Sequence, residues 1–242
     1  MKLCSIIRKI VRRTPLGNRY LTDAAFRTEI MLFFSFVMNI LVASANVVSV
    51  FLYNTFWFGI LAAYYFILAI MRLLLLRYLR HKEIGDSFLG ELKISRICGI
   101  ILLNLNFVLV GAILMILFND KGFNYQGIFI YVMAGYTFFM VAHAIRDLIG
   151  FRKYKSPIMT FSKILTLSAT LVSFLALETA IFAQFGNNIS VKIQKIVIAL
   201  TGFCVCLIVI ALALYIIINY TRIIKVIIRK RKSTNRFKEL DF

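Results

Sequence analysis

Long apolar blocks alternate along this chain with short connections that are polar and mostly basic. Backbone amides in lipid are satisfied inside helices or closed barrels, and barrel strands would show an alternating pattern over about ten residues, which is missing here. Each block has at least 21 residues, enough for a helix to cross about 30 Å of hydrocarbon. The pattern therefore predicts an all-α fold, a polytopic membrane helix bundle with six transmembrane helices. The six predicted spans are Ile30–Leu52, Phe56–Leu76, Ile97–Phe118, Ile128–Leu148, Phe161–Phe185 and Ile196–Tyr220.

The net charge of +19 can be interpreted from the positions of the 29 Lys and Arg residues along the chain. Taking the spans in order, 23 of these cations fall on one side, and only Lys121, Lys192 and Lys195 fall on the other. Short basic loops resist translocation, so the basic side is cytoplasmic and both termini lie there. The charge also favours anionic lipids at the cytoplasmic face as partners. No nucleic acid partner is predicted, because the known nucleic-acid-binding folds and interleaved aromatics are missing.

Three regions follow from this pattern: a cytoplasmic basic arm (1–29), the membrane domain (30–220) and a basic cytoplasmic tail (221–242). Residues 3–13 place apolar and basic side chains on opposite helical faces. They form either an interfacial helix or one that packs on the bundle. The first part of the tail is expected to extend the last helix into the headgroups. The four cysteines are expected to be thiols without a disulfide or metal role, and a homo-oligomer is compatible with the sequence.

Two spans carry stripes of polar residues, which are costly in lipid and therefore candidates for function. Those in the first span lie within an arc of about 80°. Such stripes indicate either a substrate or ion path or a face for close helix packing. The stripes consist of Ser35, Asn39, Asn46 and Ser49 in the first span, and Ser162, Thr166, Thr170, Ser173 and Gln184 in the fifth. The candidate path residues are Asn39, Asn46, Thr170 and Ser173, together with Glu178.

Glu178 is the only acidic residue deep in a predicted span. It lies about 10 Å from the outer end of the fifth span and points away from the polar stripe of that span. Removal from water favours the neutral form of a carboxyl group. Glu178 is therefore either a proton- or cation-coupling group or a protonated side chain hydrogen-bonded to a neighbouring helix.

A second polar cluster lies near the cytoplasmic ends of the spans and consists of Arg72, His143, Arg146 and Asp147. His143 and Asp147 share a helical face, but two ligands are too few for zinc, which needs three or four. An ion pair between Arg72 and Asp147, or extension of both arginines toward the headgroups, is the favoured interpretation. No phosphate-binding loop, activated nucleophile or intramembrane protease motif is present, so neither enzyme activity nor a cofactor is predicted.

The first two spans, from Asn39 to Val50 and from Thr55 to Ala63, resemble the membrane domain of cation diffusion facilitators. The metal-ligand positions of that family align with Tyr64 and Leu68, which cannot bind zinc in that way. The fifth span lacks H-x-x-x-D, and the cytoplasmic metal-binding domain is missing, so the resemblance implies a shared bundle shape alone. The chain is also similar to uncharacterised six-span membrane proteins of low-GC bacteria, which implies a multi-pass protein of the bacterial cytoplasmic membrane.

The polar stripes and Glu178 favour a small transporter or permeation-pathway protein. The alternative is a non-transporting membrane scaffold or regulator, whose basic cytoplasmic face binds anionic lipid or a partner. The two hypotheses differ in where the polar side chains lie. Convergence of Asn39, Asn46 and Glu178 on one water-reachable cavity favours transport, and dispersal into helix contacts favours the scaffold.

Overall fold

Five long helices make up most of the structure, a computed structural model that describes residues 24–53, 56–81, 88–118, 156–186 and 189–240, with 134–135, 137–138, 141–142 and 144. The helices are α3 (Ala24–Tyr53), α4 (Phe56–His81), α5 (Phe88–Phe118), α7 (Pro157–Phe185) and α8 (Val191–Leu240). No described residue belongs to a strand. The all-α prediction is therefore confirmed.

Each of the five helices contains a segment long and apolar enough to cross a membrane, which supports a multi-pass membrane protein. These helices coincide with five of the six predicted spans. The predicted fourth span, Ile128–Leu148, lies mostly outside the described residues, although the seven of its residues that are described are helical. Most of the predicted arm, 1–29, also lies outside the described residues, which begin at Ala24.

The third helix begins earlier than its hydropathy predicts. Helix α5 starts at Phe88, nine residues before the predicted start at Ile97, and α4 continues to His81. The extra turns of α5 are held by packing, because Leu92 is fully buried and Glu91 is nearly so. Hydropathy detects the part of a helix that contacts lipid, and it misses turns in which charged and apolar residues alternate around the helix.

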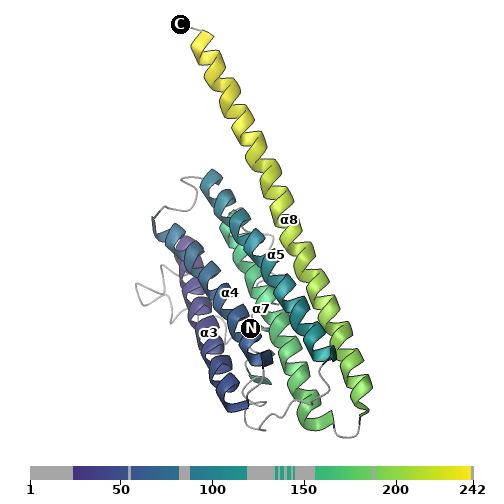
Figure 1. The fold of residues 1–242 in the computed structure, drawn as a ribbon. Helices are drawn as coiled ribbons and strands as arrows, with labels where there is room; N and C mark the ends of the chain where they lie inside the picture. The colour runs from purple at the N-terminus through teal and green to yellow at the C-terminus, as the bar shows by residue number, and fades with distance from the viewer. Residues whose placement is uncertain are drawn as a thin grey trace, which may run out of the picture.

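Helices α3 and α4 form an antiparallel hairpin at one side of the bundle (Figure 1). At its open end, Arg80 Nε donates a hydrogen bond of 2.8 Å to Glu29 Oε1. Both side chains are partly exposed, and such surface ion pairs stabilise a fold little. The hairpin is therefore held mainly by the apolar contacts along its length.

Helices α5 and α8 form the second close pair, also antiparallel (Figure 1). Asn106 Nδ2 on α5 donates to the carbonyl oxygen of Cys206 on α8 at 3.2 Å. Small residues let the two backbones approach each other: a Cβ at Gly99 would lie 3.3 Å from side-chain carbons of Ile216 and Ile217. Close approach through glycine, with an interhelical hydrogen bond, is how membrane helices commonly associate, since lipid offers no hydrophobic driving force between them.

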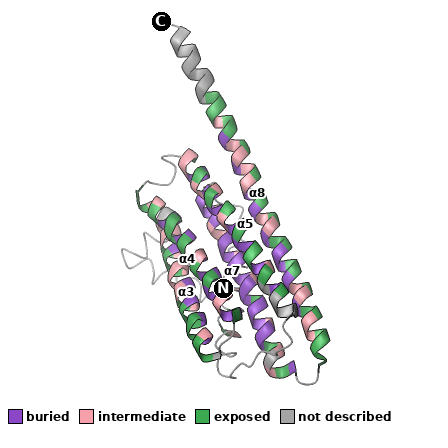
Figure 2. Ribbon diagram, viewed as in Figure 1, coloured by how far each residue is buried: buried purple, intermediate pink, exposed green. Residues whose placement is uncertain are grey.

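Helix α7 is the central helix of the bundle. In its most apolar window 72% of the residues are buried, against 22% in that of α3. Figure 2 shows the same contrast, with α7 buried along most of its length and α3 mostly intermediate or exposed. Helix α7 contacts α4, α5 and α8, so it joins the two helix pairs into one bundle.

Hydrogen bonds show which helix ends lie together. Ser156 Oγ, at the start of α7, donates to Glu91 Oε2 in the first turn of α5 at 2.7 Å. Tyr220 of α8 donates to the carbonyl oxygen of Pro157 at 3.2 Å. Helices α5 and α7 therefore run parallel, and the stretch 119–155 between them joins opposite ends of the bundle.

Helix α8 is much longer than a bilayer requires. Its 50 residues extend over about 75 Å at 1.5 Å per residue. It passes the other helices and carries the C-terminal end away from the bundle (Figure 1). The helix does not break at residue 220, where the tail was predicted to begin. The expected helical extension therefore exists and continues to Leu240.

We predict that Gly99→Leu destabilises the protein by about 2 kcal/mol, because the larger side chain overpacks the contact between α5 and α8. The measurement is the free energy of unfolding of the purified protein in detergent. Gly135→Leu is the control, because Gly135 is exposed and a Cβ there has no neighbour within 4 Å among the described residues. Equal stability of the two variants would contradict the close packing of α5 on α8.

Candidate functional site: the buried polar groups and the basic stripe of α8

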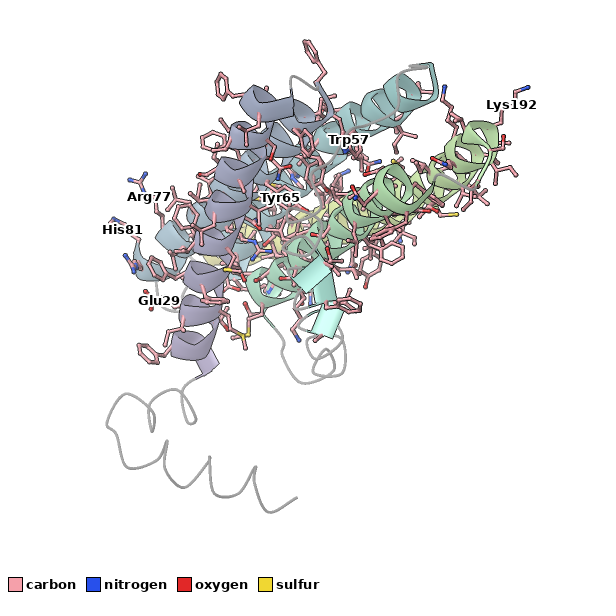
Figure 3. The ribbon with its side chains drawn as sticks, turned by 90° about the horizontal axis from the view of Figure 1, so that it is seen from below. Glu29, Trp57, Tyr65, Arg77, His81 and Lys192 are labelled. Carbon is pink, nitrogen blue, oxygen red and sulfur yellow. The ribbon has the colours of Figure 1, made fainter. Side chains whose placement is uncertain are left out.

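Polar side chains join α4 to α7 in the interior of the bundle. The hydroxyl groups of Tyr65 on α4 and Ser173 on α7 lie 2.7 Å apart. Both hydroxyl groups also lie within hydrogen-bond distance of the carbonyl oxygen of Ala169, Ser173 Oγ at 2.9 Å and the Tyr65 hydroxyl at 3.5 Å. Tyr65 lies among the helices in Figure 3. It was missed in the sequence because tyrosine is common in spans and its hydroxyl does not interrupt an apolar block.

Arg72 lies two turns along α4 from Tyr65 and is 1% exposed. Its Nη2 atom donates to Thr166 Oγ1 on α7 at 3.5 Å. Arg72 was predicted to extend toward the headgroups. In the structure its side chain instead lies between α4 and α7. In contrast, Arg77 lies at the periphery in Figure 3. The contact with Thr166 repeats the pairing of Tyr65 with Ser173 one heptad away, as expected for antiparallel helices.

Thr166, Thr170 and Ser173 of the predicted stripe on α7 are buried, whereas Ser162 and Gln184 are partly exposed. Thr166, Thr170 and Ser173 donate to the carbonyl oxygens four residues earlier, at 3.2, 2.8 and 2.9 Å. Such bonds satisfy a hydroxyl group without water. This part of the stripe is therefore a face through which α7 packs on α4.

Ser173 also marks a contact with the fourth predicted span. Thr137, one of the described residues there, is 3% exposed. Its Oγ1 atom donates to the carbonyl oxygen of Ser173 at 3.4 Å. The other members of the predicted inner cluster, His143, Arg146 and Asp147, lie outside the described residues. Among residues that are described, no group of three potential metal ligands occurs.

Asn39 and Asn46 are buried on α3, with exposed fractions of 0% and 2%. Asn46 Nδ2 donates to the carbonyl oxygen of Val42 at 2.8 Å. Neither amide atom of Asn39 has a hydrogen-bond partner among the described residues. A buried amide without a partner is unusual and commonly indicates a water molecule or a functional role.

Glu178 lies on another face of the bundle, between α7 and α8. Its Oε1 atom lies 3.0 Å from Thr201 Oγ1 on α8. Thr201 Oγ1 lies at the same distance from the carbonyl oxygen of Val197 in its own helix. A hydroxyl group has one proton, so a protonated Glu178 that donates to Thr201 would allow both hydrogen bonds at once. This contact fits the predicted hydrogen bond between neighbouring helices.

The residues proposed to form a path are thus distributed over different helix contacts. Glu178 contacts α8, while Asn39 and Asn46 belong to α3, which lies on the opposite side of the bundle in Figure 1. Thr170 and Ser173 lie on the buried face of α7. Among the described residues, no hydrogen bond joins these three groups. This dispersal matches the scaffold hypothesis better than the transport hypothesis.

The surface of α8 offers a second candidate site. One exposed stripe of this helix is apolar at Tyr215 and Ile218, which are 60% and 50% exposed. The stripe continues at intervals of three and four residues with the exposed cations Arg222, Lys225 and Arg229. These cations form no hydrogen bond or ion pair with a described residue. The face that contacts lipid chains therefore becomes basic within about one helical turn, or 5.4 Å.

Comparisons with known protein families, curated proteins and solved structures find no match for this chain.

We predict that a cysteine at position 39 reacts slowly with a membrane-impermeant thiol reagent, because the side chain there is packed. The Asn39→Cys rate should resemble that of Ala43→Cys, a buried neighbour on α3. Both should be on the order of a hundredfold slower than Ser190→Cys, because reaction requires an accessible thiolate. A rate at position 39 close to that at exposed position 190 would reveal a water-filled path.

Proposed function

We propose that this protein is a six-span membrane scaffold or regulator that binds anionic lipid at the cytoplasmic face through α8. The observation that carries the proposal is the stripe of Arg222, Lys225 and Arg229, which continues the lipid-facing surface of the helix. Tyr65, Thr170 and Glu178 support a structural role for the core, because each forms a hydrogen bond to its own or an adjacent helix.

The position of the basic stripe suits a lipid phosphate. A lipid whose chains lie against Tyr215 and Ile218 would place its headgroup beside Arg222 and Lys225, about one turn further along the helix. Val226 and Ile228 are also exposed among the cations. A mixture of apolar and basic side chains is typical of helices at the boundary between acyl chains and headgroups.

The proposed sixth crossing is supported by the direction of the helices. Because α5 and α7 run parallel, the stretch 119–155 connects opposite ends of the bundle, and Thr137 contacts α7 near its middle. A crossing there makes the number of spans even, so both termini lie on the same side. The excess of Lys and Arg assigns that side to the cytoplasm.

Transport is the second candidate, and one observation favours it. Asn39 is fully buried, and its amide has no hydrogen-bond partner in the described part of the chain. Polar groups of this kind line solute paths in membrane proteins. The cysteine reactivity at position 39 described above separates the two functions, because only a path admits the reagent.

The lipid proposal predicts that the protein selects phosphatidylserine over phosphatidylcholine. Each cation near an anionic surface contributes about 1 kcal/mol. The triple variant Arg222→Gln, Lys225→Gln, Arg229→Gln should therefore lower this selectivity by on the order of a hundredfold at low salt. Lipids retained by the purified full chain in mixed micelles, identified by mass, give the measurement. Raising the ionic strength should reduce the wild-type selectivity.

The control for this experiment is the variant Lys192→Gln, Lys195→Gln, which removes cations from the opposite end of the same helix. Its lipid selectivity should remain close to that of the wild type. A triple variant that retains phosphatidylserine as well as the wild type does would contradict lipid binding by α8.

The topology proposal predicts opposite labelling at the two ends of the stretch between α5 and α7. In intact cells, Asn124→Cys should react with an impermeant thiol reagent, and Lys153→Cys should react only after the cells are permeabilised. This result follows if one membrane crossing separates the two positions. Labelling of both positions from the same side would rule out the sixth span.

A further inference from the structure

The outer face of α5 is exposed along its length and almost entirely apolar. Its members recur at intervals of three and four residues, which places them on one side of the helix. They are Ile97, Ile100, Asn104, Phe107, Gly111 and Leu114. The exposed fraction of Phe107 reaches 65%. None of the described residues covers this face, so in the described part of the chain it is open to lipid or to another molecule.

Asn104 is the exception on this face. It follows Ile97, where the predicted span begins, by seven residues, which places it about 10 Å inside the hydrocarbon. Its Nδ2 atom donates to the carbonyl oxygen of Ile100 at 2.9 Å. The other N–H and the carbonyl oxygen of this amide form no hydrogen bond with a described residue. Lipid chains cannot supply one, so exposure of this group to lipid is unfavourable.

Asn106 shows what an asparagine does on this helix when it faces protein. It lies two residues after Asn104, is 1% exposed, and donates to the carbonyl oxygen of Cys206 on α8. The two asparagines therefore point to different sides of α5. Asn106 joins α5 to α8 within the chain. Asn104 is the only asparagine or glutamine among the described exposed residues of the five helices.

We propose that a second copy of this chain packs on the outer face of α5, with Asn104 hydrogen-bonded to Asn104 of that copy. All copies insert into a membrane in the same orientation, so the two Asn104 side chains lie at the same depth. A carboxamide is both donor and acceptor, so it is self-complementary across a two-fold axis. A single asparagine in an apolar seam is also the residue that sets register and oligomeric state in helix pairs.

Gly111 lies one heptad beyond Asn104 on the same face and is exposed. A Cβ at this position has no neighbour within 4 Å among the described residues of its own chain. The glycine leaves room for the helix of the second copy to approach closely, as small residues do at membrane helix interfaces. The same face thus supplies a polar contact, a close approach and apolar packing.

The test measures dimerisation of the full-length chain in lipid bilayers by single-molecule photobleaching at decreasing protein density. The wild type should form dimers. Asn104→Leu should weaken the dimer about tenfold, as expected for the loss of one interhelical hydrogen bond. Asn104→Gln keeps the amide and should retain the dimer. Ser44→Leu, which changes an exposed polar residue on α3, is the matched control and should behave as the wild type.

The melting temperature of each variant in detergent checks that the fold is intact. Should Asn104→Leu itself unfold, cross-linking decides. In a chain with Cys4 and Cys204 replaced by Ser, Asn104→Cys should form a disulfide-linked dimer and Ser44→Cys should not. A wild-type chain that stays monomeric in bilayers, or that dimerises equally well as a folded Asn104→Leu variant, would overturn the proposal. Equal cross-linking at positions 44 and 104 would overturn it as well.

Discussion

Lipid offers no hydrogen-bond partner, and most features of this structure follow from that constraint. The backbone meets it by forming helices, which satisfy each amide within its own segment. The hydroxyl side chains of α7 find a hydrogen-bond partner without water by donating to carbonyl oxygens one turn earlier, as Thr170 does at 2.8 Å. The remaining polar groups need another helix. Each such group therefore limits which helices can be neighbours, and this is why the polar side chains describe the assembly of the bundle better than its many apolar contacts do.

The contacts of α7 illustrate how few polar pairs are needed. Tyr65 forms a hydrogen bond with Ser173, and Arg72 forms one with Thr166. These two pairs lie one heptad apart on each helix, and together they set the register of α4 against α7. Apolar side chains in membranes pack against lipid almost as well as against protein, and they tolerate sliding of one helix along another. A misplaced Arg72 would instead leave a cation in an apolar environment, which is strongly unfavourable. The register of the central helix thus depends on these polar pairs.

Hydropathy predicted the all-α fold and located the five long helices, because contact with lipid requires continuous apolar sequence. It did not predict that α5 begins at Phe88, since turns outside the hydrocarbon contain charged residues. The stripe on α7 was predicted from helical periodicity, but its partner Tyr65 was not, because periodicity describes one helix and contains no information on which helix faces it. The sequence pattern did not single out Asn104 and Asn106, although both lie within an apolar span. Only the packing shows that one faces protein and the other faces outward.

The proposed contacts of α5 and α8 reinforce each other physically. A single chain presents one basic stripe, and three cations near the surface bind a lipid only moderately at physiological salt, where charges are screened beyond about 8 Å. Two chains joined through Asn104 present two stripes at a fixed separation, on the same side of the membrane. Binding at the second stripe then occurs at a high effective concentration, so the pair retains anionic lipid or an acidic surface more strongly than either chain alone. Helix α8 is continuous from Val191 to Leu240, so the basic stripe lies on the same helix that packs against α5 and α7.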